Sequence, residues 1–140
     1  MDRVRDLTAL AARIGIGVIF IAHGWQKFAQ DGIGATAAQF AQLGVPAPTL
    51  SALYAVTVEL AGGAALIVGF ALPVAGIAIV LDMAGAFLFV HVGFPLISPR
   101  GGELVVALGL AALYLGFAGG KYSVDTVLFN ALRNKRSVTA

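Results

Sequence analysis

Residues 13–27, RIGIGVIFIAHGWQK, decide the fold. They place three ionisable side chains, Arg13, His23 and Lys27, in a segment that is otherwise apolar enough for hydrocarbon. In a helix, which turns about 100° per residue, the three lie within about 80° of one another. This side cannot face lipid, since a charge at the bilayer centre costs about 2.5–3.5 kcal/mol. The stretch therefore predicts a membrane helix whose charged side packs against complementary charges or lines a polar cavity.

The composition of the whole chain is that of an integral membrane protein. Of its 140 residues, 59% are hydrophobic and 11% are charged, whereas about 25% are charged in soluble proteins. This length holds about four spans of ~20 residues with short connections. We therefore expect one transmembrane domain over residues 1–140. The absence of cysteine excludes thiol–disulfide exchange, iron–sulfur ligation and thiolate metal sites carried by the chain itself.

We predict an all-α bundle of four transmembrane helices. The expected spans cover about residues 7–28, 50–70, 73–91 and 102–119, and a basic tail covers 120–140. Pro48 and Pro73 stand near the starts of the second and third spans, where the missing N–H of proline is tolerated. Between the first two spans, the punctuation by glycine and proline predicts a short interfacial helix that ends at Gly44. Residues 126–132 predict a brief surface helix in the tail.

The basic residues predict the orientation in the membrane. Most of those outside the spans fall on the side that both termini share, namely Arg3, Arg5, Lys121, Arg133, Lys135 and Arg136. Arg100 lies opposite, with Lys27 at the boundary. Because positively charged loops remain in the cytoplasm, we expect both termini to be cytoplasmic.

The ionisable residues fall into two groups by depth. Those toward the outer face are His23, Lys27, His91, Arg100 and Glu103, and those deeper are Arg13, Glu59 and Asp82. Arg13 is at a depth where only Glu59 or Asp82 could pair with it, which predicts a buried charge network that fixes helix register. Asp82 and His91 are about 180° apart on an ideal helix. They could reach one partner only through a distortion between them, for which Gly85 is the obvious place.

One interpretation of these residues is a self-satisfied charge network. Its cations would be Arg13, Lys27 and Arg100, and its anions Glu59, Asp82 and Glu103. Equal numbers of opposite charges are what a network without a ligand would show. The protein would then be a purely structural, partner-binding membrane protein without a cofactor.

A second interpretation is a pocket in the outer leaflet for a quinone or a similar small ligand. His23 or His91 could donate a hydrogen bond to a carbonyl, while Glu59 or Asp82 exchanges a proton with the reduced form. Trp25 could stack on the ligand in addition to anchoring the helix at the interface. The candidate ligand-binding residues are His23, Trp25, Lys27, Glu59, His91, Arg100 and Glu103.

A metal site and a transport pathway are further alternatives. His23, His91 and either Glu59 or Glu103 could supply metal ligands, but no pair has the i, i+4 spacing of a helical metal motif, so no metal site is assigned. A small-molecule or proton transporter would need a row of polar residues through the inner half, where only Arg13 lies. No self-contained catalytic motif is present, so no catalytic residue is assigned.

Six motifs in order resemble the DoxX family of small bacterial membrane proteins. They are Arg13 with HGWQK, LGVPAP, ELAGG, LDMAGAFLFVH, GGE and KYSVD, from residue 13 to residue 125. The resemblance implies a bundle of four transmembrane helices and an association with redox work. Relatives include a subunit of a membrane thiosulfate:quinone oxidoreductase and members of oxidative-stress and thiol-homeostasis assemblies. The charged positions of the family fall on Arg13, His23, Lys27, Glu59, Asp82, His91 and Glu103.

From the residues and the resemblance together, we expect a small multi-pass subunit or anchor of a quinone-linked or oxidative-stress redox assembly in the bacterial inner membrane. At most it is the membrane subunit of an oxidoreductase, and any thiol chemistry belongs to a partner because this chain has no cysteine. The expected partners are the lipid bilayer, a protein of the redox complex, a quinone or lipid-like ligand and further copies of the chain. We expect no nucleic-acid partner.

Overall fold

The computed structural model describes residues 2–138, and all of the regular elements in that range are helices. The chain begins with α1 (Asp2–Trp25), the π-helical segment η1 (Gln26–Asp31) and the short α2 (Ile33–Gln42). A second long helix consists of α3 (Pro48–Thr57), η2 (Val58–Gly62) and α4 (Gly63–Val68). The remaining elements are α5 (Leu72–Ala86), η3 (Phe87–His91), α6 (Glu103–Phe117) and α7 (Val124–Val138).

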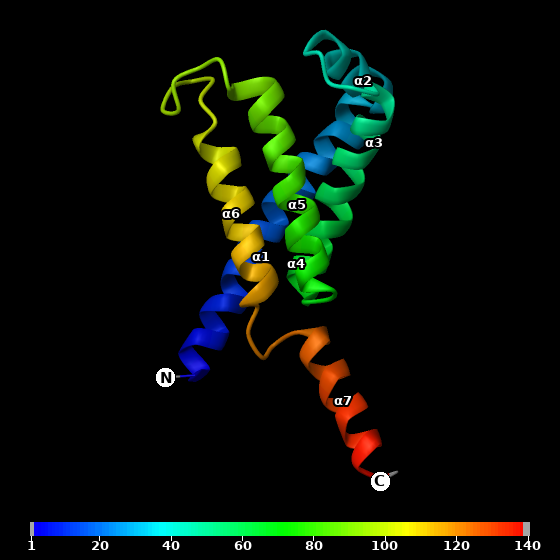
Figure 1. Cartoon of the computed structure of the whole chain (residues 1–140), viewed down its shortest axis with the longest axis vertical. Coiled ribbons are helices and arrows are strands. Elements are labelled where there is room, and N and C mark those ends of the chain that lie inside the picture. Colours follow the sequence, from blue (N-terminus) through cyan, green and yellow to red (C-terminus); the bar gives the residue numbers. More distant parts are fainter. Residues whose placement is uncertain (1, 139–140) are drawn as a thin grey trace.

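The helices form a bundle with two distinct ends (Figure 1). Both termini lie at one end, hereafter the terminal end, with the 118–123 connection. The other end, hereafter the loop end, carries α2 and the connection formed by residues 92–102. The helices α5 and α6 pack along each other, and α1 crosses the bundle obliquely (Figure 1). In the same view α7 points away from the bundle.

Three continuous helices among the described residues are long and apolar enough to cross a membrane, and they are Asp2–Asp31, Pro48–Val68 and Leu72–His91. They coincide with the predicted spans 7–28, 50–70 and 73–91, although α1 begins at Asp2 and not near residue 7. The predicted span 102–119 corresponds to α6, which has 15 residues. A helix of that length is about 22 Å long, against a hydrocarbon core of ~30 Å. That α6 crosses the membrane stays a prediction, as does the interfacial position of α2.

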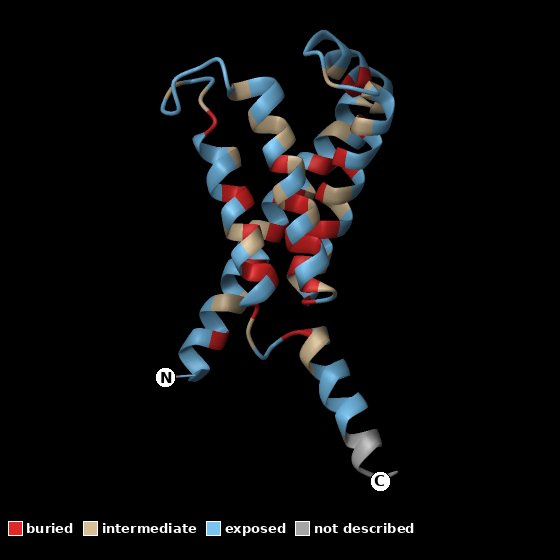
Figure 2. Ribbon diagram, viewed as in Figure 1, coloured by how far each residue is buried: buried red, intermediate tan, exposed pale blue. Residues whose placement is uncertain are grey.

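The outer faces of these helices expose large apolar side chains, while buried residues follow the centre of the bundle (Figure 2). Val18 of α1 is 53% exposed, Val74 of α5 is 69% exposed and Leu110 of α6 is 59% exposed. Extended apolar surface of this kind is unfavourable in water and ordinary in hydrocarbon. The exposed surface therefore fits a lipid bilayer.

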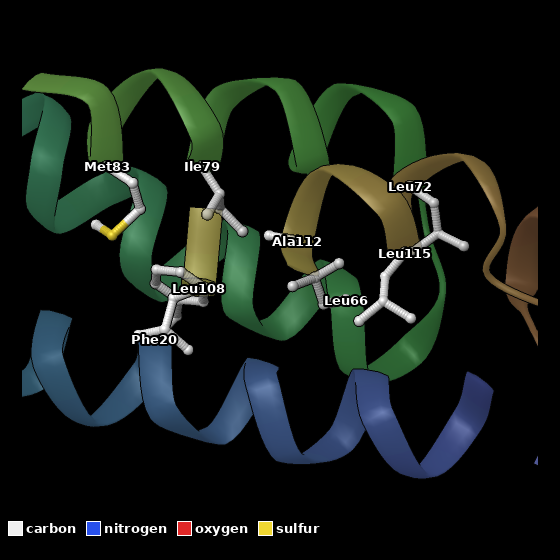
Figure 3. Packing of buried hydrophobic residues seen from close by; sticks show 8 residues of the cluster. All are labelled: Phe20, Leu66, Leu72, Ile79, Met83, Leu108, Ala112 and Leu115. Carbon is white, nitrogen blue, oxygen red and sulfur yellow. The ribbon is translucent and has the colours of Figure 1, made fainter. Parts of the chain in front are cut away.

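The core is a set of apolar side chains contributed by α1, α4, α5 and α6 (Figure 3). Its buried members are Phe20, Leu66, Leu72, Ile79, Met83, Leu108, Ala112 and Leu115. Gly62, Gly63 and Gly69 follow helical spacing on the second long helix, and such a stripe of small residues lets α1 approach it closely. A Cβ on Gly17 would lie 2.6 Å from the carbonyl oxygen of Gly63, so neither position has room for a side chain.

Arg13 fastens the terminal end of the bundle. Its fully buried guanidinium donates hydrogen bonds to the backbone carbonyls of Gly119 at 2.9 Å, of Tyr122, and of Ile67 at 3.5 Å. The prediction that Arg13 pairs with Glu59 or Asp82 is therefore wrong. The helix α6 ends at Phe117, so the carbonyls of the connection that follows it have no partner within a helix. These carbonyls accept the hydrogen bonds of Arg13 in place of a carboxylate.

Asp125 ties the base of α7 to the start of α5. Its two carboxylate oxygens accept hydrogen bonds from the backbone amides of Ala71 at 2.7 Å and Leu72 at 2.8 Å. Ala71 is the N-cap residue of α5 and Leu72 is its first residue, and Ala71 has no side chain that could cap the helix. The surface helix that the sequence predicts over residues 126–132 is part of the longer α7, which begins at Val124.

Candidate functional site

A cavity of about 650 Å³ lies at the loop end of the bundle, hereafter the loop-end cavity. It is lined by residues of α1, η1, α2, α3, η2, α5, η3 and α6, and by residues in the connections 43–46 and 98–101. Most of its lining is apolar, with Phe20, Met83, Phe89 and Leu108 among the larger side chains. The ionisable residues in the lining are His23, Lys27, Glu59, Asp82, His91 and Glu103. Its size is that of a small-molecule site, for which about 300–1,000 Å³ is typical.

Three of these ionisable residues stand on π-helical segments. Lys27 belongs to η1, Glu59 to η2 and His91 to η3. A π-helical turn inserts an extra residue into the helix and so changes which side the following residues face, and such turns are common at functional sites. The sequence predicts that Asp82 and His91 share a partner only if the helix is distorted near Gly85. The structure has that distortion from Phe87 onward, and both residues line the cavity.

Lys27 and Glu59 form an ion pair inside the cavity. The ammonium of Lys27 lies 2.9 Å from each carboxylate oxygen of Glu59. The Glu59 side chain is 4% exposed and that of Lys27 is 25% exposed. The sequence leaves Glu59 or Asp82 as the partner of Arg13, whereas in the structure Glu59 pairs with Lys27. Each charge neutralises the other, so neither is free to attract a ligand by its net charge.

Asp82 differs from Glu59 because it makes no hydrogen bond and no ion pair with the residues described, 2–138. It is partly buried on α5 and lines the same cavity. A carboxyl group of this kind in an apolar lining is costly unless it has a partner. Asp82 is therefore a carboxyl group in this site that is available to a ligand.

The imidazole of His91 is oriented by the backbone. Its Nδ1 lies 2.8 Å from the carbonyl oxygen of Arg100. A carbonyl can only accept, so Nδ1 carries the proton, and in the neutral ring Nε2 is then a hydrogen-bond acceptor. This contact ties the connection 92–102 to the end of η3.

Two predicted site residues lie outside the cavity lining. Trp25 is 54% exposed and its ring lies 6.3 Å from that of Phe28, which fits an interfacial anchor. The guanidinium of Arg100 lies 5.5 Å from the centre of the Phe94 ring, and only its backbone carbonyl reaches His91. The structure thus brings together five of the seven predicted ligand-binding residues, namely His23, Lys27, Glu59, His91 and Glu103.

The lining also includes residues absent from the predicted set. Gln39 and Phe40 of α2 line the cavity, together with Leu43, which directly follows α2, and Tyr54 of α3. The spacing of Phe40 and Leu43 indicates one apolar side on a short helix. That pattern predicts that α2 packs against another part of the protein, but it does not predict that this part is the loop-end cavity. Within the described part of the chain, no three His, Cys, Asp or Glu side chains come close enough to hold a metal ion.

Comparison with known proteins gives the family of the chain. The DoxX family model matches residues 8–92, which include η1, η2 and η3. The chain belongs to the DoxX family.

Two curated proteins are similar to this DoxX chain over nearly its whole length. "Putative oxidoreductase CatD" of Bacillus subtilis (strain 168) is 27% identical over 135 residues, covering 96% of each chain. An "Uncharacterized protein" of Haemophilus influenzae (strain ATCC 51907 / DSM 11121 / KW20 / Rd) is 32% identical over 136 residues, covering 92% of this chain and 96% of the relative. No solved structure gives a significant match.

The DoxX motifs divide between the two ends of the bundle. HGWQK, ELAGG, LDMAGAFLFVH and GGE each contribute residues to the loop-end cavity or to the helices that line it. KYSVD lies at the terminal end, where its backbone receives Arg13 and its aspartate, Asp125, caps α5. The match to the family model ends at residue 92, so the last two motifs lie beyond it.

Proposed function

We propose that this DoxX protein is a membrane subunit or anchor of a redox assembly and that it binds a quinone or a similar small ligand in the loop-end cavity. The observation that carries the proposal is the partly buried Asp82, which has no protein partner in residues 2–138 and lies in a cavity of ligand size. The printed name of the Bacillus relative, an oxidoreductase, supports the redox part. The apolar lining suits a ring with an apolar tail.

The cavity residues would divide the work of binding. When bound, a quinone supplies the exchange of two electrons and two protons, and the side chains supply position and proton contacts. His23 would hydrogen-bond one oxygen of the ring, and Asp82 would hold or release a proton at its carboxyl group. Phe40 and Leu43 would cover the ring from α2 and exclude water. Lys27 and Glu59 would keep η1 and η2 in register around the ligand.

The same proposal includes four membrane spans, with α6 as the fourth. Both termini lie at one end of the bundle (Figure 1), which is what an even number of crossings produces. Most basic residues outside the spans belong to the segments at the terminal end. We therefore assign the terminal end to the cytoplasm and the cavity to the outer leaflet of a bacterial inner membrane. A 15-residue α6 can cross if the bilayer thins locally or if its flanking residues extend to the interface.

Extraction of quinone from the purified protein tests the ligand. We expect the wild-type protein from native membranes to retain quinone in a constant molar ratio after detergent exchange. Asp82→Asn and His23→Ala should lower that ratio at least fivefold while the melting temperature stays near that of the wild type. Arg100→Gln removes a cation at the same end from outside the lining and should retain the ligand. Equal quinone in all four proteins, or none in the wild type, would refute the proposal.

A second candidate function, docking of a protein partner, is favoured by α7. This helix points away from the bundle (Figure 1) and exposes Val127, Phe129 and Leu132 at 66%, 65% and 63%. A purely structural subunit would use this surface and no cofactor. We expect the mass of the complex in mild detergent to fall to that of the chain alone in a Val127→Ser, Leu132→Ser variant. Asp82→Asn should leave that mass unchanged, and an unchanged mass in the α7 variant would exclude this surface.

A further inference from the structure

A groove of about 1050 Å³ lies at the terminal end of the bundle, hereafter the terminal groove. Its walls are α1 and α6, and the connection 118–123 completes the lining with the first residues of α5 and α7. The floor includes the buried Leu72 and Leu115, whereas Tyr114 and Phe117 of the α6 wall are 71% and 68% exposed. The groove therefore opens toward the surroundings of the bundle.

The terminal groove has the length of one lipid monolayer. On α1 its lining extends from Arg5 to Ile19, which is about 21 Å at a rise of 1.5 Å per residue. Half of a bilayer that is about 40–45 Å thick with its headgroups is about 20–22 Å. Small residues line the α1 wall at Ala9, Ala12 and Gly15, and a Cβ on Gly15 would meet no atom within 4 Å. The groove therefore has the length and the open apolar wall that an acyl chain needs.

Arg5 is the cation in the lining of the terminal groove. Its guanidinium makes no hydrogen bond with residues 2–138, and it forms an ion pair with Asp2 at 3.7 Å between side chains that are 74% and 77% exposed. Such an exposed pair contributes little, so the guanidinium is available to a phosphate, which its planar fork can bind through two hydrogen bonds. The hydroxyl of Tyr114, also without a hydrogen bond in this range, is a neutral donor. The other polar side chains of the lining are already hydrogen-bonded within the described chain, namely Thr8, Ser123, Asp125 and Thr126.

The negative charge in the lining is compensated from inside the protein. Asp125 accepts the amides of Ala71 and Leu72. It also interacts electrostatically with the buried guanidinium of Arg13, whose hydrogen-bond acceptors are backbone carbonyls. Arg5 is therefore the charge that an occupant of the groove would meet. Positive charge at the membrane surface attracts anionic lipids.

From its length, lining and charge we infer that the terminal groove binds one anionic phospholipid, with an acyl chain along the α1 wall and its phosphate at Arg5. A second copy of this chain fits the groove less well. A two-fold contact through the groove would set hollow against hollow and bring Arg5 next to its counterpart. The inference does not rest on the ligand proposed for the loop-end cavity, because the two linings share no residue.

Native mass spectrometry of the purified full-length chain in detergent tests the lipid. The probes are palmitoyl-oleoyl phosphatidylglycerol, which is anionic, and phosphatidylcholine with the same acyl chains, which has no net charge. We expect the first phosphatidylglycerol to bind at least fivefold more tightly than the first phosphatidylcholine. Arg5→Gln should lower this ratio to below twofold. Arg3→Gln, at an exposed arginine of the same helix outside the lining, should keep it.

Variants that fill the groove locate the site. Ala12→Leu and Gly15→Leu add a larger side chain to the lining, so each should weaken the binding of phosphatidylglycerol at least fivefold. Ala11→Leu adds the same side chain at an exposed position outside the lining and should bind like the wild type. All of the substituted positions are exposed, so the variants should keep the melting temperature of the wild type.

Three outcomes would overturn the inference. Equal affinity of the wild type for both lipids would refute recognition of the charge. Binding of phosphatidylglycerol that is unchanged in both Ala12→Leu and Gly15→Leu would show that the lipid binds elsewhere. A wild-type dimer that these two variants, but not Ala11→Leu, convert to a monomer would show that a second copy occupies the groove.

Discussion

Lys27 and Glu59 are joined by two hydrogen bonds of 2.9 Å, one to each carboxylate oxygen, between the π-helical segments η1 and η2. This pair is self-satisfied in the way that a structural charge network would be. The other buried cation, Arg13, is satisfied by backbone carbonyls at the opposite end. The single charge network that the sequence suggests is therefore divided in two: Lys27 pairs with Glu59, and Arg13 binds backbone carbonyls. Asp82 belongs to neither part. The structural ion pair and the proposed ligand site therefore use different acids, Glu59 and Asp82.

The ion pair predicts a strong coupling between its two partners. Lys27→Met or Glu59→Leu alone leaves one charge in the cavity without its partner, so we expect each to destabilise the protein by about 3–5 kcal/mol. The double variant removes both charges and should recover most of that loss. Thermal and denaturant unfolding of the purified protein in detergent measures the cycle. If the two single losses add in the double variant, the partners are not coupled in the folded state.

Arg13 predicts a specific weakness in the connection that follows α6. In Arg13→Met the carbonyls of Gly119 and Tyr122 lose their donor, and we expect a loss of at least about 2 kcal/mol. The segment 118–123 should then be cleaved faster by an added protease, with unchanged cleavage elsewhere. Arg5→Met, at an exposed arginine of the same helix, should change neither measurement. Equal cleavage rates for Arg13→Met and Arg5→Met would contradict the role of Arg13.

Asp125 predicts the strength of a cap supplied from outside its helix. Asp125→Ala leaves the amides of Ala71 and Leu72 without acceptors, so we expect a loss of about 0.5–2 kcal/mol. Asp125→Asn keeps one acceptor and should lose less. Asp31→Ala changes an exposed aspartate that makes no hydrogen bond or ion pair with the described residues, and it should have little effect. Equilibrium unfolding measures the free energies of unfolding of the three variants. If Asp31→Ala is as destabilised as Asp125→Ala, the capping role of Asp125 is refuted.

The long helices could be predicted from the sequence because their signals are local. Apolar runs of membrane length, with Pro48 and Pro73 near the starts of two of them, give the positions of the second and third long helices to within a few residues. The stripe of small residues after Glu59 also predicts the close approach that the structure shows between Gly63 and Gly17. These are properties of one helix face, and a sequence displays them directly.

The partners of the buried charges could not be predicted in the same way. Counting side-chain charges pairs Arg13 with a carboxylate, because the backbone carbonyls that bind it have no signature in the sequence. The π-helical turns are equally hidden, since the helices that carry them are apolar on most sides and a shift of one residue leaves no visible break in their hydrophobic pattern. They decide that Glu59 meets Lys27 and that His91 shares a cavity with Asp82. Depth along a span grouped His23, Lys27, His91 and Glu103, which all line the cavity. It assigned Glu59 and Asp82, which line the same cavity, to the deeper group with Arg13.

The crossing of α1 and α4 predicts a sharp difference between two glycines of one helix. A Cβ on Gly17 would lie 2.6 Å from the carbonyl oxygen of Gly63 and from the side chain of Ile67, so Gly17→Ala must separate the helices. We expect a loss of about 1–3 kcal/mol, the usual cost of overpacking. Gly15→Ala meets no atom within 4 Å and should be neutral or stabilising by up to about 1 kcal/mol through helix propensity. Melting temperatures of the two variants in the same detergent measure the contrast. If Gly17→Ala is as stable as Gly15→Ala, α1 and α4 do not approach each other as closely as the structure shows.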